Sequence, residues 1–115
     1  MGQLVRTIRE HFVESITTTT YYDFETDPVS PNEPWYIDAV AAELATDTPS
    51  EVRIGIRSAG YIFWFDSNNS PAPGELSRFK PQVNLREGET LVIRIYTSST
   101  AKEANAYVLG KSFRV

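Results

Sequence analysis

The sequence predicts an all-β fold: an antiparallel sandwich or barrel of seven or eight strands. Two observations predict it. Short runs rich in Val, Ile, Thr, Tyr and Phe recur along the 115 residues, and turns rich in Gly, Pro, Asn and Ser separate them. Several of these runs alternate apolar and polar residues, which is typical of strands that bury one face.

The first half of the chain contains two regions in which strands are expected. Residues 11–25 are rich in β-branched and aromatic side chains, which favour extended structure. Three prolines in residues 27–34 exclude a helix or a central strand, so this segment is expected to be a connection. Residues 35–44 follow as a strand. Four of its side chains are expected to share one face: Trp35, Ile37, Ala39 and Ala41.

Residues 51–65 are expected to form a β-hairpin. The run at 51–57 alternates cleanly. Its inward residues are Val52, Ile54 and Ile56, and its outward residues are Arg53, Gly55 and Arg57. The sequence Ser-Ala-Gly at 58–60 then turns the chain into Tyr-Ile-Phe-Trp-Phe at 61–65. This second run is apolar on both faces, which raises the question of what covers the second one.

Three more extended segments complete the predicted fold. Residues 76–85 are expected to be an edge strand, because Pro81 lacks the N–H group that a central strand would donate. Residues 90–96 and 106–115 are expected to be the last two strands. The predicted core consists of Trp35, Ile37, Val52, Ile54, Ile56, Leu91, Ile93 and Ile95.

The N-terminal residues 1–10 are expected to be an arm or a short helix ahead of a single β-sandwich domain at 11–115. Four apolar residues spaced four apart are compatible with a helical stripe: Leu4, Ile8, Phe12 and Ile16. No capping residue or C-terminal glycine frames a helix there, which favours the arm.

Composition and charge exclude several classes of function. The net charge of −4 argues against nonspecific nucleic-acid binding, and no stretch approaches the ~20 apolar residues of a membrane span. Residues 1–50 hold two basic and nine acidic residues, a net −7, whereas residues 51–115 hold nine basic and six acidic residues, a net +3. Interleaving of the two halves within one sandwich is the favoured explanation, and head-to-tail contact between copies is the alternative.

No catalytic or metal-binding motif is found. The chain has no cysteine and one histidine, His11, which is too few ligands for a zinc or copper site and leaves a serine triad without support. Asp23, Glu25 and Asp27 alternate like the first ligands of a calcium loop. Pro28, however, stands where that loop needs a glycine. We therefore expect no enzyme activity, no cofactor and no metal.

Three explanations compete for the apolar run at 61–65. It can be a central strand covered on both faces, a platform on which sugar rings stack, or a contact between subunits. Interfaces are enriched in aromatic residues, and monomers rarely leave a large apolar patch open, so the subunit contact is favoured. Its candidate residues are Leu4, Val5, Arg53, Arg57, Tyr61, Phe63 and Trp64.

The order of these features resembles small jelly-roll proteins of tailed-phage particles. The matching segments are residues 12–20, 33–44, 53–65, 83–96 and 104–113. The resemblance implies an antiparallel jelly-roll-like β-sandwich and a non-enzymatic virion protein, made in the host cytoplasm, that decorates (cements) the capsid. It further implies a homotrimer that contacts the major capsid protein or another virion protein. The alternatives are a carbohydrate-binding module or tail-fibre (receptor-binding) knob and, third, a small sugar-active enzyme.

Overall fold

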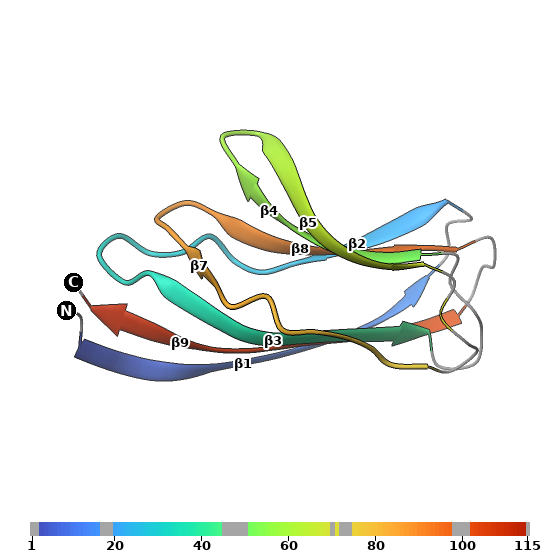
Figure 1. Cartoon of the computed structure of the whole chain (residues 1–115), viewed down its shortest axis with the longest axis horizontal. Coiled ribbons are helices and arrows are strands. Elements are labelled where there is room, and N and C mark those ends of the chain that lie inside the picture. The colour runs from blue at the N-terminus through green and yellow to red at the C-terminus, as the bar shows by residue number, and fades with distance from the viewer. Residues whose placement is uncertain are drawn as a thin grey trace.

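The computed structural model describes residues 3–16, 20–44, 51–69, 71, 75–97 and 102–114, and these residues form strands and connections with no helix. The strands are β1 (Gln3–Ile16), β2 (Tyr21–Glu25), β3 (Trp35–Leu44), β4 (Glu51–Ser58), β5 (Tyr61–Asn69), β6 (Ser77–Phe79), β7 (Val83–Leu85), β8 (Thr90–Tyr96) and β9 (Lys102–Arg114). They form two layers in a molecule of 44 × 25 × 21 Å (Figure 1).

The two sheets have the strand order of a jelly roll. Sheet A has the order β1-β9-β3, with β6 and β7 both paired to the far edge of β3, and sheet B has the order β2-β8-β4-β5. All pairs are antiparallel. Within the described part of the chain, β4 and β5 are the only consecutive strands that pair. With β6 and β7 counted as one interrupted strand, the order is that of two interleaved Greek keys, so the predicted fold class is confirmed.

The edge strand predicted at 76–85 is present but interrupted. β6 pairs with residues 40–42 of β3, and β7 pairs with residues 35–37. Pro81 lies between the two, and Gln82 has a φ of 50°, so the chain leaves the sheet there. This interruption is why the described residues form nine strands where seven or eight were predicted.

The prediction of a separate arm or short helix at 1–10 is wrong for its described residues. Gln3–Ile16 is one strand that pairs with β9 along its length. Ile8 and Ile16 are fully buried, and Phe12 packs against the core. A spacing of four is an even number, so it places side chains on one face of a strand as well as on one face of a helix.

The core lies between the two sheets, largely where the alternating runs placed it. Of the eight predicted core residues, seven are buried, and Ile56 is half-buried against the core. Buried residues of both sheets form one cluster, which includes Ile8 of the N-terminal strand. The alternate apolar positions of β4 and β8 therefore identified their inner faces correctly, although Val92 of β8 is buried as well.

On β3 the predicted face is wrong for its second half. The register shifts between Ile37 and Ala39, where a β-bulge inserts one extra residue. Beyond the bulge, Val40 and Ala42 are buried, while Ala39 and Ala41 are half-exposed on the outer face. A one-residue shift moves the following side chains to the opposite face, which period-two reasoning does not anticipate.

Candidate functional site

The β4–β5 hairpin carries the features that point to a function, and a tight turn sets its geometry. Ser58 pairs with Tyr61, so Ala59 and Gly60 form the turn. Both have positive φ angles, 52° and 85°. Positive φ at both central residues is typical of the type I′ turn, whose twist matches that of the flanking strands. The turn end of the hairpin projects away from the rest of the sandwich (Figure 1).

A β-bulge in β5 divides the hairpin into two parts. Ile54 pairs with Asp66 and Gly55 pairs with Trp64, which leaves Phe65 as the extra residue. Such a bulge bends the strand and increases its twist. The part of the hairpin beyond the bulge is the part that projects from the sandwich.

The two faces of β5 have different surroundings. Phe63 pairs with Ile56, whose side chain packs against the core, so Phe63 and Tyr61 belong to the inner face of sheet B. Ile62 and Trp64 belong to the outer face. Because β5 is the edge strand of sheet B, the explanation that residues 61–65 form a central strand covered on both faces is wrong.

On the outer face, the Trp64 ring packs over a glycine and beside two arginines. A Cβ atom on Gly55 would lie 2.8 Å from Cε3 of Trp64 and 2.7 Å from the carbonyl oxygen of Phe63, so only glycine leaves room for the indole ring. The guanidinium groups of Arg53 and Arg94 lie 5.3 Å and 4.8 Å from the centre of the Trp64 ring. Both distances are within the range of a cation–π interaction.

Arg94 is at the centre of the outer face. Its Nε and Nη2 atoms donate to the two carboxylate oxygens of Asp23 at 2.7 and 2.8 Å, a bidentate ion pair. The guanidinium also lies 3.9 Å from the centre of the Tyr21 ring and 6.0 Å from that of Tyr96. Its hydrogen bonds to Asp23 raise the pKa of Arg94 by more than burial lowers it. The guanidinium is therefore fixed in place and permanently charged.

The other arginines of this face are paired as well. Arg53 donates to both carboxylate oxygens of Glu51 at 2.8 and 3.0 Å. Nε of Arg57 donates to Oε2 of Glu25 at 3.0 Å, and the Thr90 hydroxyl donates to the same oxygen at 2.5 Å. Burial acts to raise the pKa of Glu25, but the hydrogen bonds from Thr90 and Arg57 outweigh it, so the pKa is lowered. Each arginine of this face thus has a carboxylate partner.

These ion pairs explain the uneven charge of the two halves of the chain. Asp23 and Glu25 from the acidic first half pair with Arg94 and Arg57 from the basic second half. Glu33 and Arg114 form a third pair of this kind. The two halves are interleaved, as the favoured explanation predicted.

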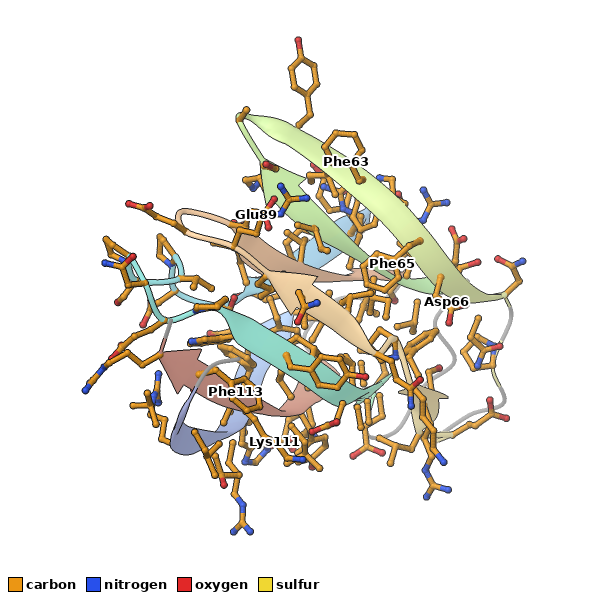
Figure 2. The ribbon with its side chains drawn as sticks, turned by 60° about the vertical axis from the view of Figure 1, so that its left-hand side comes forward. Phe63, Phe65, Asp66, Glu89, Lys111 and Phe113 are labelled. Atoms are coloured by element: carbon orange, nitrogen blue, oxygen red, sulfur yellow. The ribbon has the colours of Figure 1, made fainter. Side chains whose placement is uncertain are left out.

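Aromatic side chains along β5 are exposed among the described residues. We call Tyr61 and Phe63, on the inner face, together with Phe65, the extra residue of the bulge, the aromatic row; they are 73%, 63% and 38% exposed. Figure 2 shows Phe63 and Phe65 along one strand, with Phe63 nearer the turn and Asp66 beyond Phe65. Exposed apolar patches of this kind mark interaction sites.

The structure divides the predicted interface residues among three places. The outer face of sheet B holds Arg53, Arg57 and Trp64, and the aromatic row holds Tyr61 and Phe63. Leu4 and Val5 are also exposed, but they lie at the start of β1 in the other sheet. These residues therefore do not form one continuous surface.

Sequence reasoning missed the residues that β2 and β8 bring to the outer face. They are Tyr21, Asp23, Arg94 and Tyr96, and Asp23 was considered only as a metal ligand. One signal was present, because Arg94 stands between Ile93 and Ile95 in an otherwise apolar strand. Its partner depends on the pairing of β2 with β8, which joins distant segments of the chain.

Two hollows border sheet B and have mixed polar and apolar linings. A pocket of 490 Å³ lies between β1 and β2, where burial and the charges of Glu14 and Asp23 raise the pKa of Tyr22. A second pocket, of 360 Å³, lies beside Trp64 and Asp66. Within the described ranges, no group of three or more His, Asp or Glu side chains could hold a metal ion. No helix in the same ranges is long and apolar enough to cross a membrane.

Comparison with solved structures shows where this fold occurs. The whole chain aligns with 91% of a protein chain from Bacillus endospore appendages, a family of disulfide-linked pili, with a TM-score of 0.57 and 16% identity. It also aligns over 87% of its length with 92% of PirA, with a TM-score of 0.52 and 13% identity. A CBM4 structure aligns more weakly, with a TM-score of 0.44 and 10% identity. That alignment covers 96% of this chain and 77% of the CBM4 chain. No family model matches the sequence, and no curated protein matches it at a significant level. At such low identities, the alignments with the appendage protein and with PirA show the fold alone.

Proposed function

We propose that this chain is a non-enzymatic structural subunit that binds copies of itself and other proteins in a larger particle. The observation that supports this most directly is the exposed aromatic row on the projecting end of the β4–β5 hairpin. Interfaces place such side chains at their centres, where burial removes them from water. The finer form of the proposal is a homotrimeric decoration protein of a tailed-phage capsid, as the resemblance in strand order implies.

A protein partner fits the row better than a sugar does. A small-molecule site combines apolar walls with several polar groups that converge on the ligand. The aromatic row supplies stacking surface but only one hydroxyl group, that of Tyr61. The three arginines of the opposite face are already engaged in ion pairs with carboxylates.

We expect copies of this chain to assemble without covalent links. The sequence has no cysteine, so disulfide links between subunits are impossible. Copies held together by apolar burial alone dissociate on dilution, with a midpoint that reports the affinity. The oligomeric state is therefore a direct measure of the proposed contact.

Light scattering of the purified protein across a dilution series tests the proposal. We expect the wild-type protein to have the mass of a trimer and Phe63→Glu to be a monomer with unchanged strand content by circular dichroism. Val13→Glu is the matched control, because Val13 is 48% exposed on β1, away from the row. A wild-type monomer at micromolar concentration would contradict self-association. Binding of that monomer to immobilised glycans would then support the sugar platform instead.

A second measurement addresses the particle. Immunogold electron microscopy of particles from the phage or organism that encodes the chain distinguishes capsid, tail and non-viral appendage. We expect labelling of phage heads. Labelling of tail tips would support the fibre-knob alternative, and labelling of a cellular appendage would contradict the virion assignment.

A further inference from the structure

The outer face of sheet A contains an apolar hollow of 170 Å³. Ala39 and Ala41 of β3 form its floor, because the bulge after Ile37 turns these two small side chains outward. Tyr107 and Leu109 of β9 form one wall. We call this feature the alanine hollow.

The alanine hollow has the size of one aromatic ring. A dry apolar cavity of roughly 150 Å³ binds a benzene molecule in a well-studied protein. The Tyr107 wall is held in place by His11, whose ring stacks on it at 4.5 Å and 10°. Leu109 is 48% exposed beside it, so the hollow is open to a partner.

The rim of the hollow and the flank of the aromatic row carry opposite charges. Arg78 and Lys80 line the hollow on the β6 side, and both are exposed. Neither forms an ion pair with the described part of the chain. Asp66 follows the aromatic row and is exposed; its carboxylate accepts a hydrogen bond from the Ser67 N–H and forms no ion pair with the described residues. Charge complementarity of this kind orients partners and excludes wrong ones.

We propose that the aromatic row of one copy docks into the alanine hollow of a second copy, with the Phe63 ring entering the hollow. This inference rests on the proposed function, because it specifies which surfaces the copies use. The row belongs to sheet B and the hollow to sheet A, so the contact is heterologous and leaves each copy with one of the two surfaces free. Such contacts generate rings when the rotation closes and filaments when it does not. A trimer is the ring that closes after three copies.

Complementation between two damaged surfaces tests this arrangement. Phe63→Glu removes the row, and Ala41→Glu fills the hollow with a charge. Alone, each variant should weaken assembly by roughly 30-fold or more, as loss of a central aromatic contact does. Mixed in equal amounts, they should form a complex of two chains and nothing larger, because only one intact row can meet one intact hollow. Sedimentation velocity measures both results.

Each outcome distinguishes this inference from the proposed function. If wild-type protein assembles and Phe63→Glu dissociates it while Ala41→Glu does not, the subunit function stands and the docking arrangement is overturned. Two monomeric variants that fail to complement each other also overturn it. A monomeric wild type overturns self-assembly itself. Leu109→Glu, on the exposed wall of the hollow, replaces Ala41→Glu if circular dichroism shows that the latter does not fold.

Discussion

Phe63 and Trp64 are neighbours on one strand, yet the two faces of the β4–β5 hairpin that they occupy are built differently. On the outer face, the Trp64 ring lies over Gly55, and the arginines around it are bonded to carboxylates. On the inner face, Phe63 is 63% exposed. The difference teaches that aromatic and arginine side chains do not by themselves mark a binding surface. The face whose arginines are already paired with carboxylates stabilises the fold, and the exposed aromatic face remains for a partner.

The largest loss of stability should come from truncating a residue at the boundary between the buried and the projecting parts of the inner face. Ile54 is fully buried, and Ile56, two residues further on the same face, is only half-buried. We expect Ile54→Ala to lower the free energy of unfolding by about 2–5 kcal/mol and Ile56→Ala by about 1 kcal/mol. Urea denaturation measures both. Equal losses would show that the projecting end of the hairpin is packed as firmly as the core. That result would contradict our view that the inner face of this end is open to a partner.

Crowding at Gly55 should have the next largest effect. A methyl group there would lie 2.7 Å from a backbone carbonyl oxygen and 2.8 Å from the Trp64 ring, so Gly55→Ala should destabilise the fold by about 1–3 kcal/mol. Part of this cost should vanish in a Trp64→Ala background, because the ring is then absent. A double-mutant cycle in denaturant measures the coupling. Strictly additive losses of stability would mean that the packing of the Trp64 ring does not depend on Gly55.

Truncating the two neighbouring aromatic residues compares the faces directly. Trp64→Ala should cost about 1–2 kcal/mol of stability, because two cation–π contacts and the burial of the ring are lost. Phe63→Ala should change stability by no more than about 0.5 kcal/mol and should weaken assembly instead. Thermal unfolding of dilute monomer and light scattering of concentrated protein separate the two quantities. If Phe63→Ala lowered stability and Trp64→Ala weakened assembly, the roles that we assign to the two faces would be wrong.

The smallest effect is the dependence of stability on pH through Glu25. Its folded pKa is lowered from the ordinary value of 4.5, so its contribution is full above that value and is lost as the pH falls through the folded pKa. The side chain is 32% exposed, so solvent screens the interaction. We expect Glu25→Gln to show a shallower loss of stability below pH 4.5 than wild type. Glu87→Gln, in an exposed turn, is the control and should keep the wild-type slope.

The alternating strands explain why much of the fold was predictable. In β4 and β8 the apolar residues at alternate positions face the core as expected, from Val52 to Ile95, and all of them except the half-buried Ile56 are buried. The exceptions are bulges. Nothing in residues 35–44 indicates that the chain gains a residue after Ile37, yet that bulge turns Ala39 and Ala41 outward and creates the alanine hollow.

The candidate site was predictable only in part, because it depends on long-range pairing. The sequence correctly separated Phe63 from Trp64 onto opposite faces. It did not reveal that β5 is an edge strand, nor that Arg94 and Asp23 meet beside Trp64. Strand order within a sheet is decided by packing between distant segments, and no local pattern reports it.

The pairing of β1 with β9 has a consequence for synthesis. His11 and Asn105 are 94 residues apart in the chain, yet their side chains form a hydrogen bond of 3.3 Å. In sheet A, β9 lies between β1 and β3. At about 5–20 residues per second, the ribosome leaves β1 without its partner for roughly 5–20 s. Glu10 and Glu14 separate the apolar residues of β1 throughout that interval. Charges within an unpaired apolar segment oppose aggregation, so we expect these two acids to protect the nascent chain until β9 emerges.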